Sequence, residues 1–167
     1  MIRIETSRLI LRAPRPDDAP SVALGMGELE VARWLSVPWP YTLAMATDWL
    51  RTAPEDGLFC IEMPGRGLIG CIALGQEFGF WIARPHWGRG YATEAAQAVL
   101  GWHFGGCDTD ISSSAQGHNK SSLRVKAKLG FIETGRERRY SHALQHNVDH
   151  VLTRLTRANW LAGAGQT

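Results

Sequence analysis

The residues best suited to chemistry lie in one short loop, Trp87-Gly88-Arg89-Gly90-Tyr91, here called the glycine loop. Gly88 and Gly90 let the backbone turn sharply, and no Cβ atom shields the N–H groups around them. A helix after the loop adds unpaired first-turn N–H groups and the positive end of its dipole. The glycine loop therefore indicates a seat for an anion, best suited to a phosphate or a pyrophosphate.

Two closely spaced glycines also occur in other kinds of loop, and most of these loops require further residues. The pair can mark only a tight turn, which the pattern alone leaves open. A dinucleotide-binding loop needs a third glycine where Thr93 stands, and a nucleoside-triphosphate loop needs a Gly-Lys-Ser/Thr run, which the sequence lacks. The sequence fits neither of these two nucleotide-binding motifs.

The segments on either side of the glycine loop must position it. Residues 78–82 are mostly aromatic or branched, which suits a β-strand that ends before Arg84-Pro85. Residues 91–103 change to a helical period, with Gln97 on the solvent side of the helix. The apolar stripe of this helix consists of Ala92, Ala95, Ala96, Val99, Leu100 and His103.

The segment from Gly79 to Phe104 resembles the acetyl-coenzyme A site of the GCN5-related N-acetyltransferases (GNAT), whose loop reads Arg/Gln-x-x-Gly-x-Gly/Ala. The nearer resemblance is to the branch of ribosomal-protein N-terminal acetyltransferases. Residues 79–83 (Gly-Phe-Trp-Ile-Ala) and 87–95 (Trp-Gly-Arg-Gly-Tyr-Ala-Thr-Glu-Ala) follow that branch almost residue for residue. Pro85 departs from the family pattern, because the first loop position is usually basic.

Two further segments resemble the same branch. Residues 118–131 carry Asn-x-x-Ser followed by Lys-Leu-Gly-Phe, which the family has after its fifth strand. Read physically, Asn119 is a good helix N-cap and Gly130 a natural C-terminal stop. Residues 6–12 (Thr-Ser-Arg-Leu-Ile-Leu-Arg), followed by Asp-Asp-Ala at 17–19, are similar to the start of the branch.

The resemblance implies acetyl-coenzyme A as cosubstrate. In the family, backbone groups of the fourth strand hold the thioester and the pantetheine arm, and a bulge or splay there would leave these groups unpaired. The pyrophosphate would bind the N–H groups of the glycine loop, with charge from Arg89, and Asn119 would hold the cofactor or a water. The implied cofactor-binding residues are Ile82, Ala83, Trp87, Gly88, Arg89, Gly90, Tyr91, Ala92, Thr93 and Asn119.

Acetylation of an amine by a thioester requires a neutral amine, a polarised carbonyl and a proton for the leaving thiolate. Many family members supply that proton from a tyrosine in the helix after the fifth strand, but no tyrosine occurs between Tyr91 and Tyr140. The ribosomal-protein branch has a serine in the Asn-x-x-Ser motif, which implies this role for Ser122. The alternative is that Ser122 only faces solvent on the first helical turn.

The base that deprotonates the amine has several candidates. The resemblance implies Glu77, which precedes the fourth strand, although a carboxylate there can also be an ordinary surface group. His142, His146 and His150 are spaced four apart, which places them on one face of a helix or a strand. No Cys or acidic partner completes a metal site with them, so we expect no metal. One of these histidines could serve as the base.

Length and composition are those of one soluble globular domain, expected over residues 1–162 with a flexible tail at 163–167. No apolar run approaches the roughly 20 residues that span a bilayer, and the N-terminus has no export segment, so we expect a cytoplasmic protein. A formal net charge of +2 favours neither a nucleic-acid nor a membrane partner. Cys60 and Cys71 lie in apolar runs and are expected to be buried thiols.

The expected fold class is α/β (α+β): a single mixed, largely antiparallel sheet of about six to seven strands, flanked by helices, with a splayed parallel pair at the cofactor site. Asp17 and Asp18 are expected to cap the first helix. Strands are predicted over residues 8–12, 57–63, 68–74, 78–82, 110–114, 131–138 and 148–157, and helices over 19–24, 28–35, 42–52, 91–103 and 119–130.

Together these features predict an N-acetyltransferase that moves the acetyl group from acetyl-coenzyme A to a primary amine by direct transfer in a ternary complex. The amine is either a protein N-terminus or a small molecule. Residues 37–41 (Val-Pro-Trp-Pro-Tyr) form either a rigid connector or a wall of the acceptor pocket. The alternative function is a sensor that binds acetyl-coenzyme A or coenzyme A without turnover, and a homodimer is one assembly that we allow for.

Overall fold

The computed structural model describes residues 2–54 and 56–164, and over these residues the chain forms one eight-stranded sheet. The strand order is β1-β2-β3-β4-β5-β6-β8-β7, and only β5 and β6 are parallel neighbours within this described part. The strands are β1 (Arg3–Glu5), β2 (Ile10–Arg12), β3 (Leu58–Met63), β4 (Gly67–Leu74), β5 (Phe78–Ile82), β6 (Ile111–Gln116), β7 (Ile132–Ser141) and β8 (His146–Leu155).

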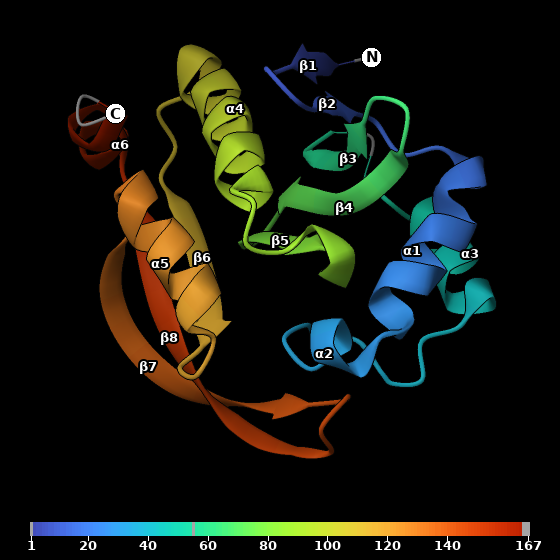
Figure 1. The fold of residues 1–167 in the computed structure, drawn as a ribbon. Coiled ribbons are helices and arrows are strands. Elements are labelled where there is room, and N and C mark those ends of the chain that lie inside the picture. Colours follow the sequence, from blue (N-terminus) through green and yellow to red (C-terminus); the bar gives the residue numbers. More distant parts are fainter. Residues whose placement is uncertain (1, 55, 165–167) are drawn as a thin grey trace.

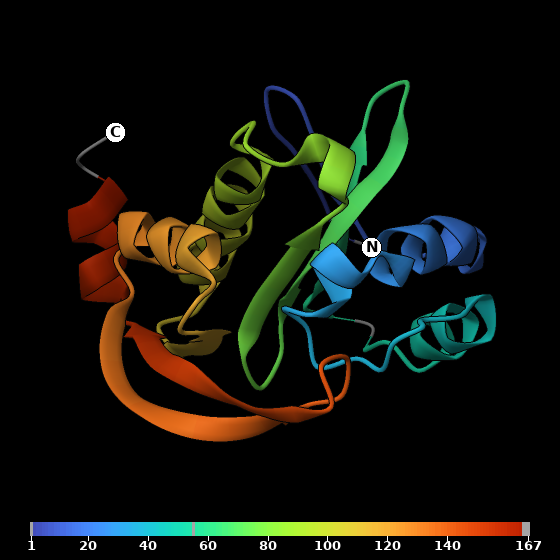
Figure 2. The same cartoon turned by 60° about the horizontal axis from the view of Figure 1, so that its bottom comes forward.

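Helices cover both faces of the sheet, as Figures 1 and 2 show. One group packs on one face of the central strands, and a second group, which begins after the glycine loop, packs on the opposite face. The first group is α1 (Ala19–Gly27), α2 (Leu29–Ala32) and α3 (Leu43–Arg51); the second is α4 (Tyr91–Gly106), α5 (Lys120–Leu129) and α6 (Arg157–Ala164). No helix in residues 2–54 and 56–164 has the length and apolar composition needed to cross a membrane.

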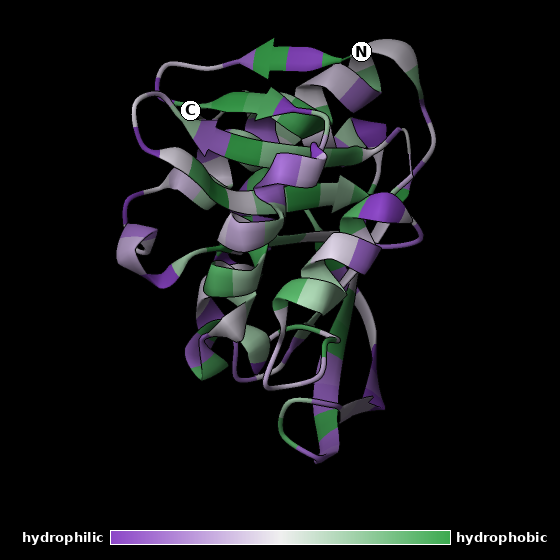
Figure 3. Ribbon diagram, turned by 90° about the vertical axis from the view of Figure 1, so that its right-hand side faces the viewer, coloured by the Kyte–Doolittle hydropathy of each residue, from purple (hydrophilic) through white to green (hydrophobic). Residues whose placement is uncertain are grey.

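The alternation of side chains along the central strands divides the core into two clusters. Phe59 and Ile72 pack on the side of α4, whereas Cys60, Cys71 and Trp81 pack on the side of α1. Hydrophobic residues, green in Figure 3, accordingly concentrate in the central strands. Cys60 and Cys71 are buried, free thiols, as predicted.

The structure confirms the predicted fold class and most of the predicted elements. The sheet has one strand more than the upper predicted number, because β1 is only three residues long and too short to show an alternating pattern. The second helix ends early, at Ala32, instead of continuing to residue 35. The predicted tail begins inside α6, which reaches Ala164, and its residues 165–167 lie outside the described part of the chain.

The predicted cap is correct in position but not in contact: Asp18 is the N-cap residue of α1, and its carboxylate accepts the Arg15 N–H at 2.7 Å in the 3₁₀ turn before that helix. Its carboxylate accepts hydrogen bonds from the Arg12 guanidinium at 2.7 and 2.9 Å, and its side chain makes no cap bond to α1. Both residues are buried, and Glu62 also accepts a hydrogen bond from Arg12 at 2.6 Å. A buried guanidinium needs such partners, and this need outweighs local helix capping.

The parallel pair diverges at once, which confirms the predicted splay. β5 and β6 share the single register pair Phe78↔Ser113, whereas β4 and β5 share five register pairs and β6 and β8 share six. Beyond Phe78 the facing edges of β5 and β6 are therefore free of each other, and we call this divergence the splay. Because the two strands are parallel, α4 and α5 both begin at its open end.

A substitution at Gly70 of β4 tests how closely β4 must approach β5. A Cβ atom at Gly70 would lie 2.2 Å from the Trp81 carbonyl oxygen and 3.1 Å from the Ile82 Cα atom. We expect Gly70→Ala to destabilise the fold by about 1–3 kcal/mol, which lowers Tm by about 2–4 °C per kcal/mol in differential scanning calorimetry. The control is Gly75→Ala, where a Cβ atom would meet nothing within 4 Å. Equal Tm values for the two variants would contradict the steric argument.

Candidate active site

The glycine loop adopts the backbone shape that the sequence predicts. After β5, residues Arg84–His86 form a 3₁₀ turn. Gly88 (φ 71°) and Gly90 (φ 79°) then take left-handed conformations that side-chain-bearing residues avoid. Gly90 is the N-cap of α4, and its carbonyl accepts the Glu94 N–H at 3.0 Å. Strand, loop and helix are therefore joined as an anion seat requires.

The N-terminal segment braces this seat through Glu94, which lies in the first turn of α4. The Glu94 carboxylate accepts hydrogen bonds from the hydroxyls of Thr6 (2.6 Å) and Ser7 (3.1 Å) and from the backbone N–H (3.0 Å) and Nε (2.6 Å) of Arg8. Arg8 also donates from Nη1 to the Arg89 carbonyl at 3.0 Å. Residues 6–12 and residues 87–95 each resemble the family. The structure shows that hydrogen bonds join these two segments.

Charge at the seat depends on this brace. Burial raises the pKa of Glu94, but hydrogen bonds from Thr6, Arg8 and Ser7 outweigh burial and hold the pKa below its usual range. The resulting carboxylate would repel a phosphate, and Arg8 neutralises it through an ion pair of 2.6 Å. The Arg8 guanidinium also lies 4.5 Å from the Tyr91 ring centroid, beside the loop. Arg8 is thus a site residue that the sequence did not single out.

The end of β5 turns a backbone edge toward the splay. The Ala83 N–H donates to the Ile69 carbonyl on β4 at 2.8 Å. Because backbone groups alternate sides along a strand, the N–H and C=O of Ile82 point away from β4. The Ile82 carbonyl accepts the Trp87 indole N–H at 2.6 Å. Of the two backbone positions predicted to contact the cofactor, Ile82 faces the open side, whereas the Ala83 N–H is already paired within the sheet.

The second predicted motif forms the start of α5. The Asn119 side chain accepts a hydrogen bond from the Ser122 N–H at 3.1 Å, and Gly130 ends the helix at φ 95°. Both predicted caps are therefore correct. Ser122 is half-buried on the first turn. The start of α5, which carries Ser122, lies at the same end of the splay as the start of α4.

Glu77, the first candidate base, is held in an ion pair. Its carboxylate accepts hydrogen bonds from Arg139 Nη2 (2.6 Å) and Nη1 (3.0 Å) and from Ser114 Oγ (2.7 Å). The Arg139 hydrogen bonds, which are stronger than the opposing effect of burial, hold the pKa of Glu77 below its usual range. A carboxylate stabilised in its charged form is a weak proton acceptor. This geometry favours a role in charge balance over a role as the base.

Lys126 is a second residue that the sequence did not single out. It lies among the basic residues in the last turn of α5, yet its side chain is buried and its Nζ donates to the Ser114 carbonyl. Burial lowers the pKa of Lys126 to about 8, and the neighbouring Glu77 opposes that shift. Ser114 thus joins Lys126, Glu77 and Arg139 in one network beside the splay. No local pattern in the sequence reveals this long-range network.

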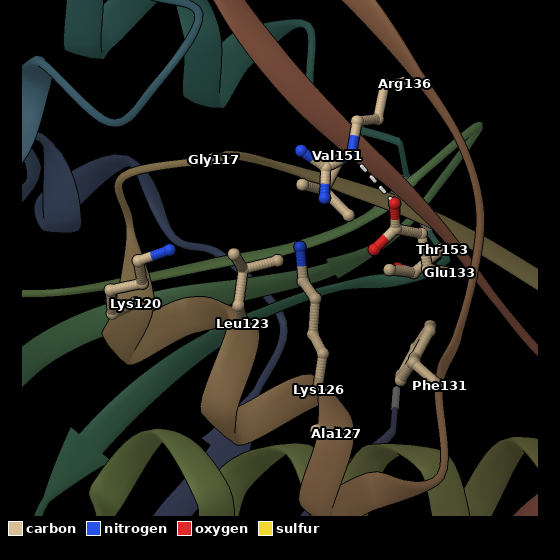
Figure 4. A pocket seen from close by; sticks show the side chains of 10 residues that line it. All are labelled: Gly117, Lys120, Leu123, Lys126, Ala127, Phe131, Glu133, Arg136, Val151 and Thr153. Carbon is tan, nitrogen blue, oxygen red and sulfur yellow. Dashed lines mark hydrogen bonds and ion pairs between the residues drawn. The ribbon is translucent and has the colours of Figure 1, made fainter.

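A cavity of about 280 Å³ lies between α5 and the strands β7 and β8 (Figure 4). Lys120, Leu123 and Lys126 of α5 line it together with Val151 and Thr153 of β8. No residue of the glycine loop contributes to its wall. The cavity is therefore separate from the predicted phosphate seat.

The three histidines of the last hairpin have different environments. His142 lies in the turn after β7 and His146 begins β8, and both side chains are exposed. His150 is buried within the sheet, with 9% of its surface exposed. Burial, followed by the charge of Arg139, lowers the pKa of His150. In residues 2–54 and 56–164 no three His, Cys, Asp or Glu side chains are placed to hold a metal ion.

Comparisons with known proteins identify the family and the fold. The model of the acetyltransferase (GNAT) domain family matches residues 8–132. The "Uncharacterized N-acetyltransferase YoaA" of Bacillus subtilis (strain 168) is 28% identical over 83% of this chain and 88% of its own length.

Solved structures share the fold. Ribosomal-protein-S5-alanine acetyltransferase from Vibrio fischeri superposes with a TM-score of 0.79 at 18% identity, over 96% of this chain and 99% of that chain. Mycobacterium smegmatis RimJ, in complex with CoA-disulfide, superposes with a TM-score of 0.73 at 22% identity, over 94% of this chain and 89% of that chain. The family model matches three quarters of the chain, including the glycine loop, the splay and the start of α5, and the chain therefore belongs to the GNAT acetyltransferase family.

Proposed function

We propose that this protein transfers the acetyl group of acetyl-coenzyme A to a primary amine by direct attack within a ternary complex. The observation that carries the proposal is the splay, which places an unpaired strand edge between the N-termini of two helices. An extended thioester arm needs such an edge for its amide groups, and its pyrophosphate needs a helix N-terminus. Both requirements are met within one continuous stretch of chain.

The residues of the glycine loop fit a pyrophosphate. A Cβ atom at Gly88 would meet nothing within 4 Å, so the space above the loop is open. The N–H groups of residues 87–92 and the guanidinium of Arg89 would bind the phosphate oxygens, with a hydroxyl contact from Thr93. Arg8 cancels the charge of Glu94 and leaves the seat favourable to an anion. Asn119, which caps α5 through its side-chain oxygen, would still offer its amide N–H₂ to the cofactor.

The bound acetyl-coenzyme A supplies a thioester carbonyl carbon to the acceptor amine. We assign the Ile82 N–H, which faces the splay, to the carbonyl oxygen, where it would stabilise the charge that develops on attack. Ser122 Oγ–H would protonate the leaving thiolate. Glu77, which the resemblance implied as the base, would keep Arg139 and Lys126 charge-balanced beside the splay.

The acceptor is a primary amine of a protein N-terminus or of a small molecule. The Vibrio fischeri neighbour, named ribosomal-protein-S5-alanine acetyltransferase, supports the first class. Residues 37–41 would form one wall of the acceptor pocket, because Trp39 Nε1 donates to the Gly27 carbonyl at 2.8 Å and fixes the segment beside α1. A cytoplasmic location and a homodimer belong to the same proposal. Binding of coenzyme A without turnover is the rival function.

Calorimetry and a thiol-release assay test the proposal together. We expect acetyl-coenzyme A to bind with a measurable heat, and we expect free thiol to appear with one amine class in a panel that includes N-terminal peptides. No binding would overturn the proposal. Binding without thiol release across the panel would favour the sensor.

Arg8→Ala tests the brace of the seat. Removal of the guanidinium leaves the Glu94 carboxylate without its ion-pair partner and removes a cation from the loop. We expect the Kd for coenzyme A to rise about tenfold or more in calorimetry, since a charge-assisted hydrogen bond contributes about 1.5–3 kcal/mol and each 1.4 kcal/mol is about tenfold in Kd. The matched control is Arg3→Ala, whose exposed guanidinium pairs with Glu5. Equal Kd values in both variants would contradict the role of Arg8.

Ser122→Ala tests the proton donor. Loss of the hydroxyl should lower kcat by about 10²-fold, the usual contribution of a positioned acid, and leave the Kd for coenzyme A unchanged. Steady-state thiol release and calorimetry separate the two quantities. The control is Ser121→Ala, one position earlier and exposed. Full turnover in Ser122→Ala would remove this hydroxyl from the mechanism.

A further inference from the structure

His150 occupies an unusual position for an ionisable side chain. It lies on β8, with Gln116 of β6 and Glu137 of β7 as its cross-strand partners. The side chain is nine-tenths buried, and its Nδ1 atom has no hydrogen-bond partner within the described residues. A buried polar atom without a partner costs free energy, and such atoms in native proteins call for a functional explanation.

The strand register places His150 level with the end of β5. Three residues beyond the pair Phe78↔Ser113, β5 reaches Trp81 and β6 reaches Gln116, on opposite sides of the splay. His150 is the β8 partner of Gln116. The imidazole is therefore one strand away from the splay, at the height where the thioester carbonyl is proposed to bind.

The face of the sheet that carries His150 is the one turned toward α2. The Gln116 side chain points to that face, because its Nε2 donates to the Arg33 carbonyl, just after α2, at 2.6 Å. Directly opposed residues on neighbouring strands share a face, so His150 points the same way. Trp81, on the same face, also has a buried Nε1 without a partner among the described residues. His150 Nδ1 and Trp81 Nε1 thus both lack a hydrogen-bond partner on this face. A bound amine compound can offer such partners.

The charged groups around His150 come from three other elements. Arg139 and Glu137 extend from β7, Lys126 from α5, and Glu77 from the residue just before β5. Arg139 forms ion pairs with both Glu77 and Glu137, and Lys126 adds a second positive charge. Burial and the charge of Arg139 lower the pKa of His150 below its ordinary value of 6.5, which favours the neutral imidazole.

We propose that His150 is the general base for the acceptor amine, an inference that rests on the proposed acetyl transfer. A primary ammonium would donate the hydrogen bond that the buried Nδ1 lacks. Glu77 is the weaker candidate, because its carboxylate is already stabilised by Arg139 and Ser114.

The proton transfers balance in this scheme. The ammonium gives one proton to the imidazole of His150, which frees the nitrogen lone pair. The amine nitrogen then bonds to the thioester carbonyl carbon as the carbon–sulfur bond breaks. The thiolate takes a proton from Ser122, the second amine proton replaces it, and the proton on His150 passes to solvent.

The test compares pH profiles of wild type, His150→Gln and His146→Gln. His146 is an exposed histidine on the same strand and serves as the matched control. We measure kcat/KM for the amine by thiol release at saturating acetyl-coenzyme A, and the Kd for coenzyme A by calorimetry. We expect His150→Gln to lower kcat/KM about 10²-fold or more, with cofactor Kd unchanged within twofold, and His146→Gln to match wild type.

The pH dependence separates a base from a structural residue. A base with a lowered pKa works while neutral, so wild-type kcat/KM should fall as pH drops through a value below 6.5, and His150→Gln should lack this limb. A limb that persists in His150→Gln, or is absent in wild type, overturns the inference; the wild-type measurement applies even if the variant fails to fold. Absence of any wild-type turnover would instead overturn the proposed function.

Discussion

The early divergence of β5 and β6 is the constraint on which the rest of this structure depends. A parallel pair normally continues along both strands, yet here it consists of one register pair, Phe78↔Ser113. The sheet remains continuous because β4 holds β5 on one side and β8 holds β6 on the other. Under the proposed function, the extended arm of acetyl-coenzyme A would pair with these free strand edges. The two helices that follow these strands begin at the same open end.

Charge neutralisation stabilises both sides of this opening. On the α4 side, Arg8 pairs with Glu94, and on the sheet side Arg139 pairs with Glu77. Each pair removes a negative charge from a region where a polyanionic cofactor is proposed to bind. Each pair also joins residues that are far apart in the chain. The same ion pairs therefore set the charge of the site and make it rigid. The pKa of Lys126 is lowered to about 8 because its side chain is buried.

Local features of the site were predictable from the sequence, and long-range ones were not. Gly88, Gly90, Asn119 and Gly130 have roles set by backbone geometry within a few residues, so their motifs predict them directly. The partners of Glu77 depend on how β8 inserts between β6 and β7, which no local pattern records. The same holds for the burial of His150, since equal spacing does not distinguish it from the exposed His142 and His146. The strands β7 and β8 pair as far as Ser141 and His146, beyond the predicted bounds at residues 138 and 148, because the hairpin continues pairing through polar residues.

The brace between the N-terminal segment and α4 also bears on folding and local stability. Thr6 and Glu94 are 88 positions apart in sequence, so the seat is complete only after the first residues dock against a helix made much later. Such a contact makes the N-terminal strands β1 and β2 and the glycine loop one cooperative unit. A ligand that binds the seat would then slow amide hydrogen exchange in β1 and β2, far along the chain from any atom it touches.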